Sequence, residues 1–217
     1  MGCGGSMMTD YGDMSLDDYR DALASSDPTP GGGTAAAVAL SQAAALTCMV
    51  ADLTLGSERW QDGWLGAQAA KDVATPLLAR GHELAGEDAA AFDAVMAAFR
   101  LPKDSDDEQV RRRAEIRDAT LGAAEVPLKT AQEALSLLNT LPELSRSGNS
   151  NAVTDVGVAG LLASAACKGA LFNVEINAKS LPDELATILL EELDGLRGSA
   201  KQISRELMDS VNRRIND

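Results

Sequence analysis

Apolar residues recur every three or four positions along most of the chain, a spacing that is typical of helices with one buried face. The stripe is clearest near the C-terminus, where Leu185, Leu189 and Leu193 begin a series that continues to Val211. No stretch alternates apolar and polar residues in the manner of a strand, and we find neither an internal repeat nor an interdomain linker. The predicted helices cover residues 15–25, 34–56, 63–79, 83–100, 108–145, 152–178 and 185–211.

Glycine and proline residues mark the interruptions between these helices. Residues 27–33 contain two prolines and three glycines, so we predict a glycine-rich loop before the second helix. A second polar loop is predicted at residues 147–151, and Pro127 should kink or break the long helix over residues 108–145. The expected fold class is therefore all-α, a multi-helix bundle of long amphipathic helices.

Composition narrows this expectation to a single domain. Hydrophobic residues form 45% of the 217 residues but aromatic residues only 3%, so the core must be built mainly from alanine, leucine, valine and methionine in closely packed helices. A chain of this length can share one hydrophobic core. We expect residues 1–14 to form a disordered leader and residues 15–217 to form one helical domain.

The charge of the chain excludes some classes of partner. A formal net charge of −14 would repel nucleic acids and anionic membrane surfaces. The apolar run over residues 34–55 includes Ser41, Gln42 and Asp52, as expected of a buried helix rather than a membrane span. The three cysteines lack metal-ligand spacing, and the single histidine, His82, cannot form a histidine metal site alone. We expect a soluble, cytoplasmic protein with reduced cysteines and no metal.

Asp88 is the first candidate for chemistry, because it lies on the same predicted helical face as Leu84, Phe92 and Val95. Burial of an unpaired carboxylate is costly, so Asp88 should either accept hydrogen bonds or have a raised pKa that suits general acid–base chemistry. The alternative is that Asp88 caps the first turn of its helix, where a negative charge suits the helix dipole. The pattern alone leaves both interpretations open.

Two further segments could contribute to a site. Asp155 begins a helical face of small residues that ends at Asn173 and Asn177, although the pattern favours a plain helix-start role for Asp155. The other segment is glycine-rich and would present backbone N–H groups at a helix N-terminus, an arrangement that suits an anion or a carbonyl oxygen. The alternative is that its glycines only allow the chain to turn tightly. That segment is Gly31, Gly32, Gly33 and Thr34.

Four groups of segments are specific when they are taken in their order and spacing. They are Asp27–Thr34 with Met49–Gly56, Glu87–Phe92 with Arg100–Lys103, Val126–Leu128, and Gly148–Asp155 with Phe172–Asn177. Together they resemble the cyclodeaminase domain of formiminotransferase-cyclodeaminase and the related methenyltetrahydrofolate cyclohydrolases. The resemblance runs from about Ser15 to the final helix.

The resemblance implies an all-helical fold that assembles as a homodimer, with a pocket that takes a folate without a metal or redox cofactor. It implies that Asp88 is catalytic, and it raises Asp155 to a second catalytic candidate. The folate-binding residues would then be Gly31, Gly32, Gly33 and Thr34 in the pocket wall, Arg100, Lys103 and Lys179 near the glutamate tail, and Asn151, Asn173 and Asn177 beside water and pterin.

The function we expect is hydrolysis of 5,10-methenyltetrahydrofolate to 10-formyltetrahydrofolate, with Asp88 as general base and stabiliser of the cation. The methenyl carbon is already cationic, so water can add to it without a metal. One alternative is a formiminotetrahydrofolate cyclodeaminase that releases ammonia, and the lack of a formiminotransferase segment favours the hydrolase over it. The other alternative is a non-catalytic helical binding or scaffold protein.

Overall fold

The computed structural model describes residues 11–216, and residues 1–10 and 217 lie outside that range. The predicted all-α fold is confirmed, because every regular element within the described range is helical. The elements are α1 (Leu16–Leu23), α2 (Gly32–Leu55), the 3-10 helix η1 (Glu58–Gly63), α3 (Trp64–Phe99), α4 (Asp106–Ser147), the 3-10 helix η2 (Ser150–Ala152), α5 (Val153–Ala178) and α6 (Asp183–Asn216).

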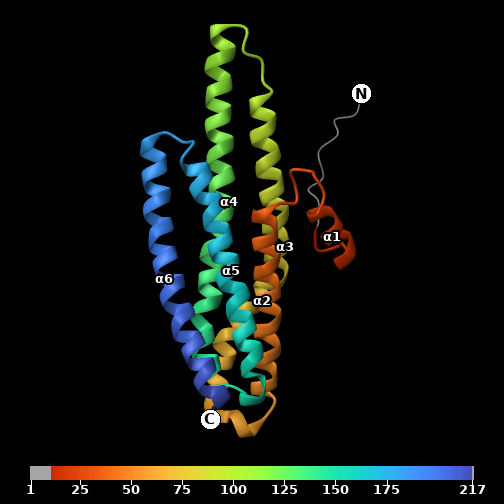
Figure 1. Ribbon diagram of the computed structural model, residues 1–217, viewed down its shortest axis with the longest axis vertical. Helices are drawn as coiled ribbons and strands as arrows, with labels where there is room; N and C mark the ends of the chain where they lie inside the picture. The colour runs from red at the N-terminus through yellow and green to blue at the C-terminus, as the bar shows by residue number, and fades with distance from the viewer. Residues whose placement is uncertain (1–10, 217) are drawn as a thin grey trace.

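The five long helices run along the long axis of the molecule, whereas the short α1 lies to one side near the start of α2 (Figure 1). Helices α3 and α4, of 36 and 42 residues, project beyond the others as a hairpin. Helix α5 packs against α2, α4 and α6. The start of α2 and the end of α5 therefore both lie near the base of the α3–α4 hairpin.

Alanine dominates the contact between the two central helices, α2 and α5. Fully buried alanines occur on both helices, and their small side chains let the backbones approach closely. They include Ala37, Ala43 and Ala44 on α2 and Ala159, Ala163, Ala166 and Ala170 on α5. By length and composition both helices could cross a membrane, but 56% of each apolar window is buried inside the protein, as in core helices of a bundle.

The prediction of two separate helices over residues 63–79 and 83–100 is wrong. The structure has one continuous helix through Gly81 and His82. A Cβ atom at position 81 would lie 2.8 Å from the Ala37 carbonyl oxygen, so this glycine allows α3 to lie directly against α2. Nearby, His82 Nε2 lies 3.2 Å from the Ser41 hydroxyl, which ties the two helices together.

Proline and glycine also interrupt the helices less than the sequence predicts. Helix α4 continues through both Pro127 and Pro142, so the alternative of a break at Pro127 is wrong. Helix α2 begins at Gly32, two residues earlier than the predicted start at Thr34. The glycine-rich segment therefore supplies the first turn of α2 as well as the loop before it.

The predicted leader overlaps the packed part of the chain. Its first ten residues lie outside the described range, but Tyr11 is only 7% exposed and Met14 packs against the core. Tyr11 contacts Tyr19 of α1 in an edge-to-face arrangement, with ring centroids 6.0 Å apart. These contacts connect the segment before α1 to the body of the protein.

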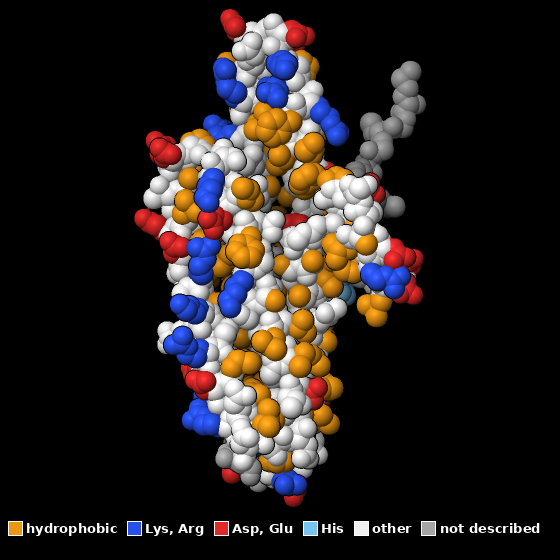
Figure 2. All heavy atoms as spheres, in the orientation of Figure 1, with side chains coloured by type: hydrophobic (Ala, Val, Ile, Leu, Met, Phe, Trp, Pro, Cys, Tyr) orange, Lys and Arg blue, Asp and Glu red, His pale blue; other side chains and the backbone are white. Residues whose placement is uncertain are grey.

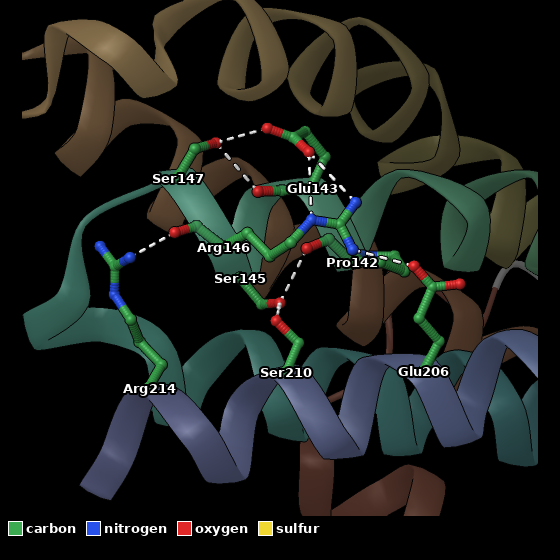
Figure 3. A network of polar contacts seen from close by, with 8 residues as sticks. All are labelled: Pro142, Glu143, Ser145, Arg146, Ser147, Glu206, Ser210 and Arg214. Carbon is green, nitrogen blue, oxygen red and sulfur yellow. Dashed lines mark hydrogen bonds and ion pairs between the residues drawn. The ribbon is translucent and has the colours of Figure 1, made fainter. Parts of the chain in front are cut away.

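The end of the bundle opposite the hairpin is closed by polar contacts between α4 and α6 (Figure 3). The buried Ser145 and Ser210 hydroxyls lie 2.6 Å apart, and Arg146 forms an ion pair with Glu206 at 2.9 Å. Arg214 donates hydrogen bonds to backbone carbonyls at the end of α4, where helical carbonyl groups lack partners. These contacts fix α6 along α4 far from the hairpin base.

Candidate active site

A pocket of about 250 Å³ opens at the base of the α3–α4 hairpin, where the start of α2 and the end of α5 meet interior turns of α3 and α4. On the face drawn in Figure 2, the surface is hollowed at this level, with hydrophobic side chains around the hollow. Asp88 is the ionisable residue of its lining. The lining residues are Pro28, Thr29, Gly31, Gly32, Gly33, Asp88, Phe92, Val95, Ala123, Asn173 and Asn177.

The Asp88 carboxylate lies against the first turn of α2. Its Oδ2 accepts a hydrogen bond from the buried Thr34 hydroxyl at 3.1 Å, and the carboxylate also accepts one from the Thr34 backbone N–H. The N-cap residue of α2, Gly31, provides no side-chain cap. Asp88 therefore supplies from α3 the acceptor that an N-cap side chain normally provides, beside the positive end of the α2 dipole.

Gly33 makes this arrangement possible. A Cβ atom at position 33 would lie 2.2 Å from Asp88 Oδ1 and 2.6 Å from the carboxylate carbon. Any side chain there would displace the carboxylate from the helix terminus. The alternative that Asp88 caps its own helix is wrong, because Asp88 lies 24 residues after Trp64, deep inside α3.

Two opposing effects act on the pKa of Asp88. Burial raises this pKa because it disfavours the charged form, and the hydrogen bonds from Thr34 lower it by a smaller amount. The net pKa lies above its usual value. Such a carboxylate is a stronger base than a solvated one and still has donors that hold its ionised form.

Two tyrosines lie near the carboxylate on the α1 side. The Tyr19 hydroxyl is buried and has no hydrogen-bond partner among the described residues. Burial raises the pKa of both Tyr11 and Tyr19, and the negative charge of Asp88 raises them further. The segment from Tyr11 through α1 thus helps to keep this side of Asp88 away from water.

The family model for Formiminotransferase-cyclodeaminase matches residues 15–194, which is most of the chain. The chain belongs to this family. A methenyltetrahydrofolate cyclohydrolase from Methylorubrum extorquens is 35% identical over 206 residues, which cover 94% of this chain and 99% of that protein. The formimidoyltransferase-cyclodeaminase of Gallus gallus is 34% identical over 182 residues, which cover 79% of this chain and 33% of that longer protein.

A solved structure of the family has the same fold. The formiminotetrahydrofolate cyclodeaminase from Thermotoga maritima matches with a TM-score of 0.84 at 27% identity, over 94% of this chain and 98% of that one. The resemblance found in the sequence is therefore confirmed. Members of the formiminotransferase-cyclodeaminase family carry names that describe reactions of tetrahydrofolate derivatives.

Half of the twelve residues predicted for this family's site line the pocket. A seventh, Thr34, is buried beneath it and bonds to Asp88. The lining residues among them are Gly31, Gly32, Gly33, Asp88, Asn173 and Asn177. The two asparagines lie one turn apart near the end of α5, facing the pocket across from the start of α2.

The structure places Asp155 and Asn151 elsewhere. Asp155 lies in the first turn of α5, 22 residues before Asn177, or about 33 Å along the helix at 1.5 Å per residue. Asn151 is exposed in η2, and its backbone N–H donates to the Asn149 side chain. Neither residue lies in the Asp88 pocket of the same chain, and a catalytic role for Asp155 stays a prediction.

The three predicted cations lie outside the pocket lining as well. Arg100 ends α3, 12 residues or about 18 Å beyond Asp88, and Lys103 lies in the exposed turn that follows. Lys179 follows the end of α5 and forms an ion pair with Glu175 at 2.7 Å. The pocket itself therefore offers oxygen acceptors and backbone groups rather than cationic side chains.

Sequence reasoning missed some residues that shape this site. Ala123 of α4 lines the pocket, and Tyr19 lies close enough to Asp88 for the carboxylate charge to raise its pKa, yet neither has a chemical signature in its local sequence. The sequence feature that could have indicated Ala123 is Pro127, four residues later. Proline has no backbone N–H, so the Ala123 carbonyl lacks its usual partner within the helix. Among the described residues, no group of three or more histidine, cysteine, aspartate or glutamate side chains could hold a metal ion.

Proposed function

We propose that this protein is a methenyltetrahydrofolate cyclohydrolase that converts 5,10-methenyltetrahydrofolate to 10-formyltetrahydrofolate in the cytoplasm. The observation that carries the proposal is the partly buried Asp88 carboxylate, which is held by Thr34 and faces a pocket lined by Phe92 and Val95. Full-length similarity to a protein of that name supports the same reaction.

The pocket size suits one part of the substrate. A volume of about 250 Å³ is smaller than that of most sites for drug-sized ligands, at roughly 300–1,000 Å³. The pterin ring and its methenyl bridge would occupy it, and the glutamate tail would extend outside. Of the three predicted cations, Lys179 follows the helix that carries Asn177, so we assign the tail to that side of the opening.

Asp88 acts as the general base in the proposed reaction. The carboxylate takes a proton from a water molecule while the oxygen of that water bonds to the cationic methenyl carbon. Protonated Asp88 then gives that proton to N5 as the bond between N5 and this carbon breaks. The remaining hydroxyl proton is released, so the cation and water yield 10-formyltetrahydrofolate and one proton.

The pocket also stabilises the positive charge of the substrate. Asp88 is ionised when it acts as base, and the low local polarity of Phe92 and Val95 strengthens its attraction to the cation. As the reaction proceeds, the Thr34 donors hold the carboxylate at a fixed position. Replacement of Asp88 would remove both the base and the counter-charge.

A second candidate reaction is the cyclodeaminase reaction, which the names of other relatives favour. In this reaction N10 attacks the carbon of a 5-formimino group. The formimino nitrogen then gains a proton and leaves as ammonia. Protonated Asp88 would be the acid in that step. The residues of the pocket are compatible with either substrate.

The test is a side-by-side assay of both substrates with purified protein. Loss of 5,10-methenyltetrahydrofolate absorbance, corrected for spontaneous hydrolysis, measures the first reaction, and ammonia release from 5-formiminotetrahydrofolate measures the second. We expect faster turnover of the methenyl compound. Faster ammonia release would favour the second reaction, and inactivity toward both would favour a binding or scaffold protein.

We propose in addition that the protein forms a homodimer through the exposed sides of α2 and α5. Residues 32–51 of α2 and 156–167 of α5 contain no charged residue, although the chain has 24% charged residues. Figure 2 shows hydrophobic side chains gathered where these helices reach the surface. The exposed large hydrophobic residues on these helices are Met49, Leu53, Val158, Leu161, Phe172 and Ile176. An apolar surface of this extent usually marks an interface.

A further inference from the structure

Pro127 lies buried within α4, where it leaves one backbone carbonyl without its normal partner. In an α-helix each carbonyl accepts a hydrogen bond from the N–H four residues later. Proline has no N–H, and its ring pushes against the carbonyl four residues before it. The carbonyl affected here belongs to Ala123, which lines the pocket.

Asn177 of α5 supplies the missing donor. Its Nδ2 lies 2.8 Å from the Ala123 carbonyl oxygen and 2.9 Å from the Asn173 carbonyl oxygen. Both amide protons are therefore used, and the opposite orientation would place Oδ1 against two carbonyl oxygens. The side-chain amide has one possible orientation, with Oδ1 as its free polar atom.

The free oxygen belongs to the pocket. Asn177 lines the cavity together with Asp88, and its Oδ1 accepts no hydrogen bond from the described residues. This oxygen is also absent from the fully buried atoms that lack a partner in the described range. It is thus open to solvent, on a side chain that lines the cavity.

We propose that Pro127 is a positioning residue for this pocket: it frees the Ala123 carbonyl, which holds the Asn177 amide so that Oδ1 accepts a hydrogen bond from the ligand. Within this arrangement the pocket presents two oxygen acceptors, from Asp88 and Asn177. It therefore selects a ligand group that donates N–H bonds or carries positive charge. The identity of that group as a pterin rests on the proposed function.

The first experiment observes the Asn177 side chain directly and needs no folate. In spectra of ¹⁵N-labelled protein, its amide signals are assigned by their disappearance in Asn177→Ala. Pro127→Ala restores an N–H that competes for the Ala123 carbonyl, so we expect these signals to shift. The matched control is Pro142→Ala, a second buried proline of α4 about 22 Å away, which should leave them in place. Unchanged signals in Pro127→Ala would overturn the proposal.

The second experiment measures binding of 5-formyltetrahydrofolate by calorimetry. Pro127→Ala should weaken binding about three- to tenfold, the factor expected for one misplaced hydrogen bond. In the Asn177→Ala background the same change should have no further effect. An equal loss in both backgrounds would contradict the proposal, because Pro127 would then act independently of Asn177. Absence of binding by the wild type would contradict the proposed function and leave the spectroscopic test intact.

A second variant keeps the proposal testable if Pro127→Ala does not fold. Asn177→Asp keeps the size and the oxygen of the side chain but cannot donate to the Ala123 carbonyl. We expect its affinity for 5-formyltetrahydrofolate to fall as far as that of Asn177→Ala. Wild-type affinity in Asn177→Asp would show that the donation is unnecessary and would overturn the proposal.

Discussion

At the scale of single residues, the site depends on a glycine and an aspartate that share one small space. Gly33 has no side chain, so the Asp88 carboxylate can reach the Thr34 donors at the start of α2. The sequence predicted Asp88 from its place on an apolar face. It could not predict the cap, because Asp88 and Thr34 are 54 residues apart and only tertiary packing brings them together.

Gly33→Ala should therefore displace the Asp88 carboxylate from the Thr34 donors, which should lower the activity and cost about 1–3 kcal/mol of stability, as loss of hydrogen bonds to a charged group does. The control is Gly195→Ala on α6, where an added Cβ meets no atom within 4 Å. That change should stabilise the protein by about 0.5–1 kcal/mol, because alanine favours helix. Urea unfolding measures both variants. Equal stability of the two variants would contradict the close contact between Gly33 and Asp88.

The raised pKa of Asp88 predicts a pH-dependent effect of Asp88→Asn on stability. The folded protein holds the Asp88 proton more tightly than the unfolded chain, so wild-type stability falls as pH rises through the interval between the two pKa values. That interval begins near the unfolded pKa of about 3.9. The substituted asparagine side chain does not titrate, so the stability of the variant relative to wild type should increase across this interval and then level off.

Unfolding free energies of both proteins between pH 4 and pH 8 measure this difference, with Asp93→Asn as the control at an exposed position of the same helix. The control should show no such increase. A relative stability of Asp88→Asn that falls with rising pH would mean that hydrogen bonding to the ionised form outweighs burial.

At the scale of elements, glycine and proline serve contacts between helices more than they end them. The sequence predicted a break near Gly81 and a kink or break at Pro127, yet α3 and α4 continue through both. Local rules treat these residues as interruptions because they consider one helix at a time. In the folded protein, Gly81 admits α2, and Pro127 exposes a carbonyl to α5.

Gly81→Ala should cost about 1–3 kcal/mol of stability, because its Cβ would lie 2.8 Å from the Ala37 carbonyl oxygen and 2.9 Å from the Ser41 nitrogen. Gly122→Ala on α4 is the matched control, since an added Cβ there meets nothing within 4 Å. In thermal unfolding, the midpoint temperature should be lower than that of the wild type for Gly81→Ala and higher for Gly122→Ala. If Gly81→Ala were as stable as Gly122→Ala, the contact between α2 and α3 would be looser than described.

At the scale of the whole molecule, the sequence predicted the all-α class and the alanine-rich core well, because helical periodicity and composition act over many residues. The location of the pocket needed the three-dimensional arrangement, in which α2, α3, α4 and α5 meet at the hairpin base. Five predicted residues lie outside the pocket lining, because the sequence does not show where the other helices meet α3 and α5. Those residues are Arg100, Lys103, Asn151, Asp155 and Lys179.

The proposed homodimer belongs to this scale. Light scattering with size-exclusion chromatography should give twice the chain mass of 22.6 kDa for the wild type. Leu161→Glu, at a side chain that is 59% exposed on α5, should shift the protein to the monomer mass, because a desolvated charge is costly in an interface. Ile188→Glu on α6, 64% exposed, is the control and should remain dimeric. A wild-type monomer would contradict the homodimer.

The central claim is that Asp88 performs the reaction in the pocket at the start of α2. The most direct measurement is the decay of 5,10-methenyltetrahydrofolate absorbance with wild type and with Asp88→Asn, after subtraction of the spontaneous rate. We expect the wild type to accelerate the decay and the variant to be slower by about 10²–10⁴, the usual contribution of a general base. Wild-type activity in a folded Asp88→Asn protein would contradict this account.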